Sequence, residues 1–225
     1  MCKQAEATPN KVRERAFIFD GDGVIVQWTS KLAEFAKSKG LPFEHIIDAN
    51  KNNLFLPSCE LFSTVDEEEA MELLREYNRS EFISQLTPMS QDTGASLNKI
   101  SELGKLILVT CIGTDPVSFL HRTANITNVC GANIFEEMHF LDVNESKENK
   151  IRELAERYDV GYFVDDRARH VTEGINAGVT SYQFALNTDA SRLDQNLCHA
   201  VNWLELIELA HEFKDKMDLR DQVFA

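Results

Sequence analysis

Long apolar runs and paired cysteines are both missing from the 225-residue sequence. No stretch approaches the roughly 18–20 consecutive apolar residues of a spanning helix, so we expect no membrane segment. The five cysteines are odd in number and form no CxxC pair, and no apolar segment near Met1 resembles a secretory signal. We therefore predict a cytoplasmic protein.

Positive charge is scarce as well. The chain has 23 lysines and arginines against 37 aspartates and glutamates, which gives a formal net charge of -14. Nucleic acids and anionic membranes attract basic surfaces, so neither is an expected partner. An anionic substrate is compatible with this balance, because a metal ion or a few local cations can reverse the field at one site.

Apolar residues make up 43% of the sequence, which is enough for a buried core. From residue 90 onward, short apolar runs that predict buried strands alternate with patterns that predict helices. The predicted strands, including one that precedes this region, lie at residues 16–20, 106–110, 137–141, 161–164 and 179–184. Such alternation is typical of a Rossmann-like α/β core with three layers and a mostly parallel sheet.

The segment between the first two predicted strands is helical instead. Thr29 or Ser30 is expected to cap a first helix, and further helical patterns follow. Some 60 residues are too many for a loop in a compact domain. We therefore predict a small all-helical cap domain at residues 28–88, inserted into an α/β core formed by residues 14–27 and 89–225.

Two carboxylates, Asp20 and Asp22, follow the first predicted strand in a glycine-rich turn. A calcium-binding EF-hand beginning at Asp20 would need glycine at its sixth position and glutamate at its twelfth, where the chain has Ile25 and Lys31. A dinucleotide-binding fingerprint would need a third glycine where Val26 stands. An ordinary Asx/Gly turn and a reactive site remain as interpretations of the pair.

Polar side chains also follow the other predicted strands. Thr110 ends the second strand, Lys147 opens the helix after the third, and Asp165-Asp166 end the fourth. Each has an ordinary explanation alone, as a turn threonine, a surface lysine or a helix cap, and Lys150 is an alternative to Lys147. The carboxyl ends of parallel strands meet at one sheet edge, where ligands bind. Together these residues therefore predict a phosphoryl-transfer site.

With these residues in this order, the chain resembles the haloacid dehalogenase-like superfamily, whose members are mostly magnesium-dependent phosphatases. The matching stretches are Phe19-Asp20-Gly21-Asp22-Gly23-Val24, Leu108-Val109-Thr110, Ser146-Lys147 and Phe163-Val164-Asp165-Asp166. They lie in the predicted core, in the family's order. Gly21 departs from the pattern, because family members more often carry a larger apolar residue there, but the change removes no reacting group.

The resemblance implies a role for each matching residue. Asp20 would be the nucleophile that forms an aspartyl-phosphate, and Asp22 would act as general acid and base. Thr110 and the amide of Cys111 would hold phosphate oxygens. Lys147 would neutralise both the phosphate and the nucleophile.

The same resemblance implies Mg²⁺ as the cofactor, an ion that prefers octahedral oxygen ligands. Asp20, the backbone carbonyl of Asp22, and Asp165 or Asp166 would supply its protein ligands, and we expect Asp166 to make the closer contact. The six histidines are scattered without an HExxH motif, so no zinc site is expected. His170 is interpreted as an ordinary helix residue.

These roles together predict a phosphoric monoester hydrolase that acts on a small phosphorylated metabolite beneath a closing cap. A phosphomutase or phosphotransferase acting on a sugar phosphate would use the same residues, and a non-catalytic module that binds Mg²⁺ and a phosphorylated ligand is a further alternative. Asp22 argues against dehalogenase chemistry, which needs no acid there. Cys111 is either a site of oxidation or an inert thiol. The sequence indicates neither the substrate nor the oligomeric state.

Overall fold

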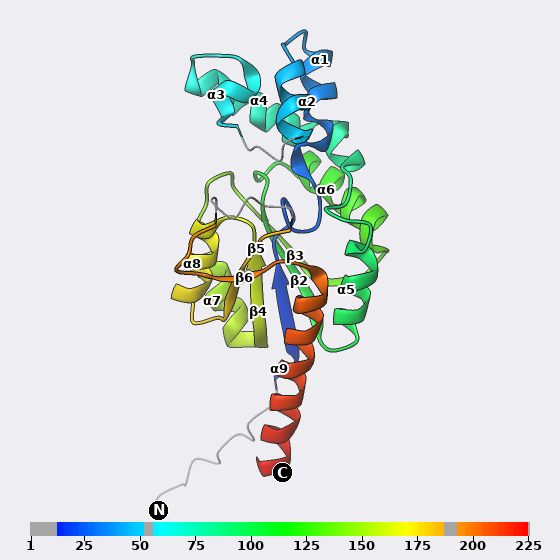
Figure 1. Ribbon diagram of the computed structural model, residues 1–225, viewed down its shortest axis with the longest axis vertical. Coiled ribbons are helices and arrows are strands. Elements are labelled where there is room, and N and C mark those ends of the chain that lie inside the picture. Colours follow the sequence, from blue (N-terminus) through cyan, green and yellow to red (C-terminus); the bar gives the residue numbers. More distant parts are fainter. Residues whose placement is uncertain (1–12, 52–55, 187–192, 225) are drawn as a thin grey trace, which may run out of the picture.

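A six-stranded, all-parallel sheet forms the centre of the protein (Figure 1). The computed structural model describes residues 13–51, 56–186 and 193–224. In spatial order the strands are β3 (Phe135–Leu141), β2 (Lys105–Cys111), β1 (Arg15–Phe19), β4 (Asp159–Asp165), β5 (Ser181–Phe184) and β6 (Cys198–Ala200). The sheet confirms the Rossmann-like α/β class predicted from the sequence.

Helices cover both faces of this sheet. One face carries α5 (Thr93–Ser101), α6 (Pro116–Cys130) and α9 (Trp203–Phe224), and the other carries α7 (Glu148–Arg157) and α8 (Ala168–Asn176) (Figure 1). α6 begins where the sequence has the Asp115-Pro116 pattern of an N-cap followed by proline at the first helical position. The Asp115 side chain accepts a hydrogen bond from Val117 N at 2.8 Å, and Pro116 occupies the first turn.

β1 lies in the middle of the sheet because both of its faces are apolar. Ala16, Phe17, Ile18 and Phe19 are all fully buried. Phe17 and Phe19 pack in the cluster that includes residues of α5, α6 and α9, whereas Ala16 and Ile18 pack on the opposite face with residues of α7. Two covered faces are typical of the central strand of a parallel sheet. The strand therefore delivers the residue that follows it into the interior.

Between β1 and β2 the chain forms a helical unit at one end of the sheet (Figure 1). It contains α1 (Leu32–Ser38), α2 (Glu44–Lys51), α3 (Ser58–Phe62) and α4 (Glu67–Arg79), with 3-10 turns at Trp28–Lys31 and Glu81–Gln85. The chain enters and leaves this unit side by side. Gln27 N donates to Thr87 O, and Met89 N donates to Ile25 O, both at 2.9 Å.

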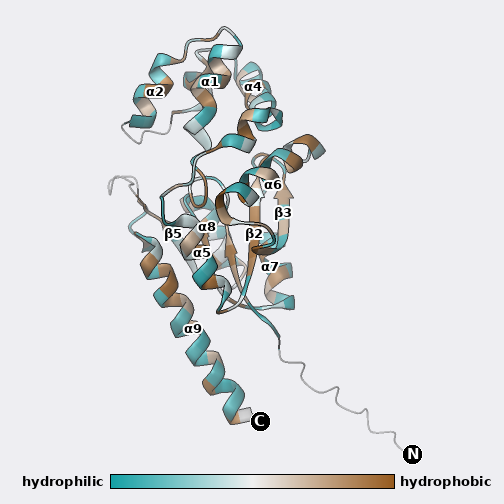
Figure 2. Cartoon of the chain, turned by 90° about the vertical axis from the view of Figure 1, so that its right-hand side faces the viewer, coloured by the Kyte–Doolittle hydropathy of each residue, from teal (hydrophilic) through white to brown (hydrophobic). Residues whose placement is uncertain are grey.

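Several elements differ from the sequence prediction. The first helix begins at Leu32 after a 3-10 turn that contains Thr29 and Ser30, so its N-cap is Lys31 and neither of the predicted residues. The hydroxyl of Ser30 instead accepts a hydrogen bond from Thr87 N at 3.1 Å. The pattern does not predict α3 or β6, which are short. It predicts a last helix at about 201–214, whereas α9 (Trp203–Phe224) continues ten residues further. Figure 2 shows why: the apolar residues of α9 are concentrated in its first half, and polar residues dominate toward the C-terminus.

None of the helices in the described ranges is long and apolar enough to cross a bilayer.

Candidate active site

The turn after β1 places its first carboxylate at the buried edge of the sheet. Asp20 N donates to the carbonyl of Val164 at 2.9 Å, so this residue continues the strand pairing. Gly23 then turns the chain with a φ of 77°, a conformation that favours glycine. A Cβ on Gly23 would lie 2.3 Å from Oδ2 of Asp166. The turn and the residue after β4 are therefore in close contact.

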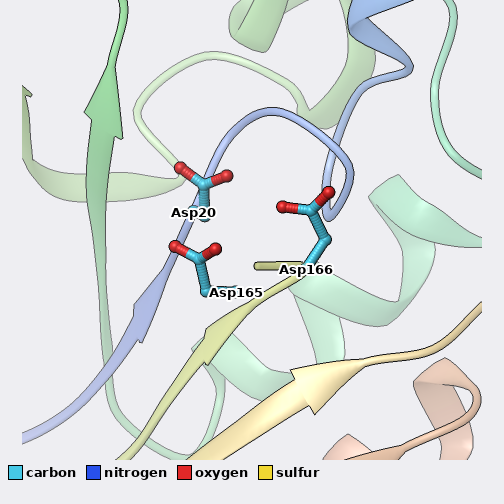
Figure 3. A group of neighbouring side chains, drawn as sticks. All are labelled: Asp20, Asp165 and Asp166. Carbon is cyan, nitrogen blue, oxygen red and sulfur yellow. The ribbon is translucent and has the colours of Figure 1, made fainter. Parts of the chain in front are cut away.

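Three carboxylates gather between these two strand ends. Oxygens of Asp20, Asp165 and Asp166 all lie within 4.8 Å of one another. Figure 3 shows the side chain of Asp20 after β1 and those of Asp165 and Asp166 at the end of β4, directed toward one region. Carboxylates this close repel one another unless a cation lies among them.

Lys147 supplies one such cation. Its buried side chain at the start of α7 places Nζ 2.5 Å from Asp20 Oδ1 and 2.7 Å from Asp165 Oδ2. Burial alone would lower the pKa of Lys147, but the two carboxylates outweigh burial and raise that pKa above its ordinary value. Lys150, the alternative in the sequence, instead pairs with Glu153 at 2.5 Å.

Burial and neighbouring charges set the protonation of the two carboxyl groups that contact Lys147. Burial raises the pKa of Asp20 to about 6, although Lys147 opposes the shift, so this group is ionised at neutral pH. Burial also acts to raise the pKa of Asp165, but Lys147 and His170 outweigh it, and the pKa falls below its ordinary value. Asp20 is therefore in the form that a nucleophile needs.

Asp165 and Asp166 have different partners, so they differ in how available each carboxylate is to a metal ion. Besides the lysine, Asp165 contacts Nδ1 of His170 at 3.2 Å and accepts a hydrogen bond from Arg167 N at 2.9 Å. The Asp166 carboxylate accepts none from any residue in the described ranges. Burial, Asp165 and Asp20 together raise its pKa well above the ordinary value. A divalent cation would relieve this crowding, and the oxygen-only donor set suits Mg²⁺. The residues fit that ion, with Asp20 and Asp166 best placed to hold it.

At the end of β2, the side chain of Thr110 lacks a hydrogen-bond partner within the described chain, whereas that of Cys111 has one. The hydroxyl of Thr110 is buried and has no hydrogen-bond partner within the described chain. Such a group costs roughly 1–3 kcal/mol, which an anion oxygen in the site would offset. Burial raises the pKa of the Cys111 thiol to about 12, and its sulfur lies 3.7 Å from Glu145 O. A protonated thiol is a poor nucleophile, so the structure favours the inert alternative for Cys111.

Asp22 has a different partner from the other carboxylates. Its side chain is 25% exposed, and Oδ1 lies 2.5 Å from Nη1 of Arg122, a fully buried residue of α6. This contact spans 100 residues of chain. Asp22 is therefore held by a residue of α6, which covers one face of the sheet, whereas Lys147 contacts the carboxylate cluster from the start of α7, which covers the other face.

Two further residues belong to this site and are not among the predicted ones, His170 and Arg122. His170 lies in α8 as expected, but it also contacts Asp165 and lines the pocket. Arg122 carries a faint sequence signal, because Ser118, Arg122 and Asn125 place polar side chains on the buried face of α6, where apolar residues are the rule. The pattern marks the helix face and leaves the partner of each side chain open.

A cavity of about 440 Å³ opens beside these groups. From the sheet edge it is lined by Asp20, Asp22, Thr110, Cys111, Lys147 and Asp166. From the helical unit and its entry segment it is lined by uncharged residues, among them Trp28, Asn50, Leu61, Met71, Leu74 and Asn78. The structure thus brings together all the predicted site residues, with Asp165 beneath the cavity as a partner of Lys147.

No family model matches the sequence. A curated relative, an uncharacterized 32.4 kDa protein of enterobacteria phage T4, is 34% identical to it over 151 residues. The match covers 67% of this chain and 53% of the phage protein. The chain therefore spans about half the length of that relative.

Solved structures similar to this one have the haloacid dehalogenase-like fold. A hydrolase of that family from Streptococcus pneumoniae has a TM-score of 0.61 at 16% identity, over 88% of this chain and 97% of its own. A HAD-hydrolase from Bacillus subtilis, solved bound to magnesium, has a TM-score of 0.56 at 15% identity over 88% and 99%. An L-2-haloacid dehalogenase has a TM-score of 0.54 at 15% identity, over 87% of this chain and 97% of its own. The chain thus has the fold of haloacid dehalogenase-like hydrolases, as its motifs predict.

Proposed function

We propose that the protein is a Mg²⁺-dependent phosphatase that hydrolyses a small phosphorylated metabolite through an aspartyl-phosphate on Asp20. The observation that carries the proposal is the position of the Lys147 ammonium, within 2.7 Å of carboxylate oxygens of both Asp20 and Asp165. A buried ammonium at this point neutralises the nucleophile and the phosphoryl group that it attacks. Because dehalogenases share the fold, it is the residues of the site that favour phosphoryl transfer.

In the first half-reaction, a carboxylate oxygen of Asp20 attacks phosphorus, and the bond from phosphorus to the leaving oxygen breaks. Asp22, as the carboxylic acid, gives its proton to that oxygen, so the alcohol leaves neutral. The hydroxyl of Thr110 and the amide of Cys111 donate hydrogen bonds to the phosphoryl oxygens, and Lys147 balances their charge. The products are the free alcohol and phosphorylated Asp20.

In the second half-reaction, water attacks the phosphorus of the aspartyl-phosphate. Asp22, now a carboxylate, takes a proton from the water, and the bond between Asp20 and phosphorus breaks. Inorganic phosphate leaves with the oxygen of the water, and both aspartates return to their starting states. Lys147 remains paired with Asp165, which keeps the ammonium in position while Asp20 is esterified.

The carboxylates of Asp20 and Asp166 and the backbone carbonyl of Asp22 would hold Mg²⁺. When bound, the ion supplies charge neutralisation for the phosphoryl group. Asp165 then acts as the partner of Lys147. His170 contacts the same carboxylate oxygen, and Arg167 N donates to the other one.

The cavity supports a small substrate whose non-phosphate part faces an uncharged helical wall, with Arg167 on the side of the sheet, and we propose that the helical unit acts as its cap. A volume of about 440 Å³ is typical of small-molecule sites. The described residues of the unit that line it carry no charge, so none of them would compensate a second ionised group on the substrate. Trp28 and Leu61 offer apolar surface, and the amide of Asn78, which accepts a hydrogen bond from Trp28 Nε1 at 3.0 Å, offers polar atoms.

Hydrolysis of p-nitrophenyl phosphate tests the proposal. The wild-type protein should release p-nitrophenol with Mg²⁺ and stop when the ion is chelated, and Asp20→Asn should abolish turnover with an unchanged circular dichroism spectrum. Full activity of Asp20→Asn would refute the nucleophile assignment. No turnover of this ester or of a broad panel of phosphorylated metabolites would favour the non-catalytic binding module.

A second measurement separates hydrolysis from transfer. With a labelled sugar bisphosphate, a phosphatase releases the label as inorganic phosphate, whereas a phosphomutase returns it to a second position of a sugar. Label recovered only in the sugar would replace the phosphatase proposal with the mutase.

A further inference from the structure

Arg122 is a buried group of the site that the proposed reaction leaves without a role. None of its side chain is exposed, and Nη1 lies 2.5 Å from Asp22 Oδ1. Its Nε and Nη2 atoms have no hydrogen-bond partner in the described parts of the chain. Desolvating a guanidinium is costly unless its donors are satisfied. A group that only anchored the fold would be expected to have more partners than this one carboxylate.

The turn between β1 and the helical unit leaves room for this guanidinium. A Cβ on Gly21 would lie 3.3 Å from Nη1 of Arg122 and 3.0 Å from Oγ1 of Thr110, both closer than ordinary contact. A longer side chain at this position would compete with one or both groups for space. Gly21 therefore allows Arg122 to reach Asp22 from behind the turn.

The two oxygens of Asp22 have different surroundings. Asp22 lines the cavity, and Arg122 does not. Arg122 holds Oδ1, while Oδ2 accepts no hydrogen bond from any part of the chain that the structure describes. One oxygen is fixed and the other is free for a ligand. A proton donor needs such a fixed position, because proton transfer depends strongly on the distance and direction to the accepting atom.

We propose that Arg122 is a positioning residue for Asp22, fixing one carboxyl oxygen so that the other exchanges its proton with the leaving-group oxygen. The role rests on the proposed phosphatase function. Arg122 itself neither gives nor takes a proton: the proton passes from Asp22 to the leaving oxygen, and later from water to Asp22. The guanidinium acts only through the carboxyl that it holds.

The test compares leaving groups, because only some of them need a proton. Wild-type protein, Arg122→Met and Arg122→Lys are each assayed with 2,4-dinitrophenyl, p-nitrophenyl and phenyl phosphate. Dinitrophenolate leaves readily without protonation, whereas phenolate leaves slowly unless it is protonated. The ratio kcat/KM covers the steps up to phosphorylation of Asp20, so the later reaction of Asp22 with water does not enter the comparison.

Arg122→Met should lower kcat/KM for phenyl phosphate by roughly 10²-fold, the lower range of general acid catalysis. The loss on dinitrophenyl phosphate should be much smaller, with p-nitrophenyl phosphate between them. Arg122→Lys should lie between wild type and Arg122→Met, because an ammonium keeps the charge but lacks the planar fork of the guanidinium.

Asn125→Ala is the matched control. Asn125 is buried on the same face of α6, where its Nδ2 donates to Leu86 O at 2.9 Å, and it does not line the cavity. Its replacement should lower the melting temperature without changing the ratio between the esters. Should Arg122→Met fail to fold, Arg122→Lys carries the same comparison, since it retains a buried cation.

Equal losses on all three esters would overturn the proposal, because an arginine that only supports the fold affects every leaving group alike. If the wild-type protein hydrolyses none of the three esters, the proposed function fails, and the role of Arg122 fails with it. If the wild-type protein is active, the ratio between the esters alone decides.

Discussion

The charge balance of the site depends on Lys147. This ammonium faces Asp20 and Asp165 away from solvent, an arrangement that is stable only while the opposite charges remain paired. A phosphoryl group adds further negative charge at the same point. Removing the ammonium would therefore weaken phosphate binding and leave two buried carboxylates opposed.

At the residue scale, Lys147→Ala should reduce phosphatase activity by roughly 10²–10³-fold, the range for losing one electrostatic contact to the reacting group. Lys150→Ala should change it little, because Lys150 forms a surface pair with Glu153. Initial rates with p-nitrophenyl phosphate and thermal melts of both variants give the comparison. A larger loss in Lys150→Ala would reassign the site lysine.

A comparison of alanine substitutions at Gly23 and Gly40 distinguishes the effect of backbone strain from that of steric crowding. Both have positive φ, 77° and 72°, but a Cβ on Gly23 would meet Asp166 whereas one on Gly40 would meet nothing within 4 Å. The positive φ alone should lower the free energy of unfolding by about 1 kcal/mol in each alanine variant, and the clash with Asp166 should add to this loss in Gly23→Ala. Only Gly23→Ala should also raise the Mg²⁺ concentration for half-maximal activity, which a metal titration measures. Equal Mg²⁺ requirements in the two variants would contradict the contact with Asp166.

The residues at the strand ends can be predicted from sequence patterns more easily than the residues that contact them. Asp20, Thr110, Lys147 and Asp165 follow or end predicted strands, and the parallel sheet brings such positions to one edge. Arg122 reaches Asp22 from the middle of a helix, and no local pattern specifies a contact made across the fold. Pairing between distant side chains requires the packing of α6, which the sequence does not show.

At the scale of elements, the helical unit supplies the uncharged wall of the cavity. Leu74→Asp, in α4, places a carboxylate beside the substrate. For the most active phosphate ester whose alcohol part carries no charge, we expect kcat/KM to fall by roughly tenfold or more. Val65→Asp is the control, because Val65 is fully exposed in the same unit. A metabolite screen with both variants checks the prediction. Equal rates in the two variants would exclude Leu74 from the substrate wall.

The elements themselves were predicted where pattern and length were sufficient. β1, β2 and β4 are continuous apolar runs, and the Asp115-Pro116 signal correctly starts α6. β6 consists of only Cys198–Ala200, too short for a period to appear, and its place in the sheet comes from pairing with β5. The far end of α9 carries no apolar stripe to extend the prediction.

For the whole molecule, Mg²⁺ should act as a stabiliser. Binding to the folded state at a hundredfold excess over the dissociation constant adds about 2.7 kcal/mol to the free energy of unfolding. Thermal melts should therefore rise with Mg²⁺ in the wild-type protein. Asp166→Asn should melt higher than wild type without the ion, because one crowded carboxylate is gone, and respond little to it.

Asp215→Asn makes the same chemical change at an exposed position of α9. It should keep the full response of the melting temperature to Mg²⁺. A response of Asp166→Asn as large as that of Asp215→Asn would contradict the assignment of Asp166 as a metal ligand.

The chain enters and leaves the helical unit at one point, where Val26 pairs with Pro88, and this has a consequence for folding kinetics. β1 must find β2 across the whole insertion, as in the pairing of Phe19 with Leu108, and such non-local contacts slow folding. Helices form from near neighbours. A helical unit that assembles first would join Val26 to Pro88 and remove most of the intervening chain from the search. The segment that walls the cavity would then also speed the meeting of the two strands that carry Asp20 and Thr110.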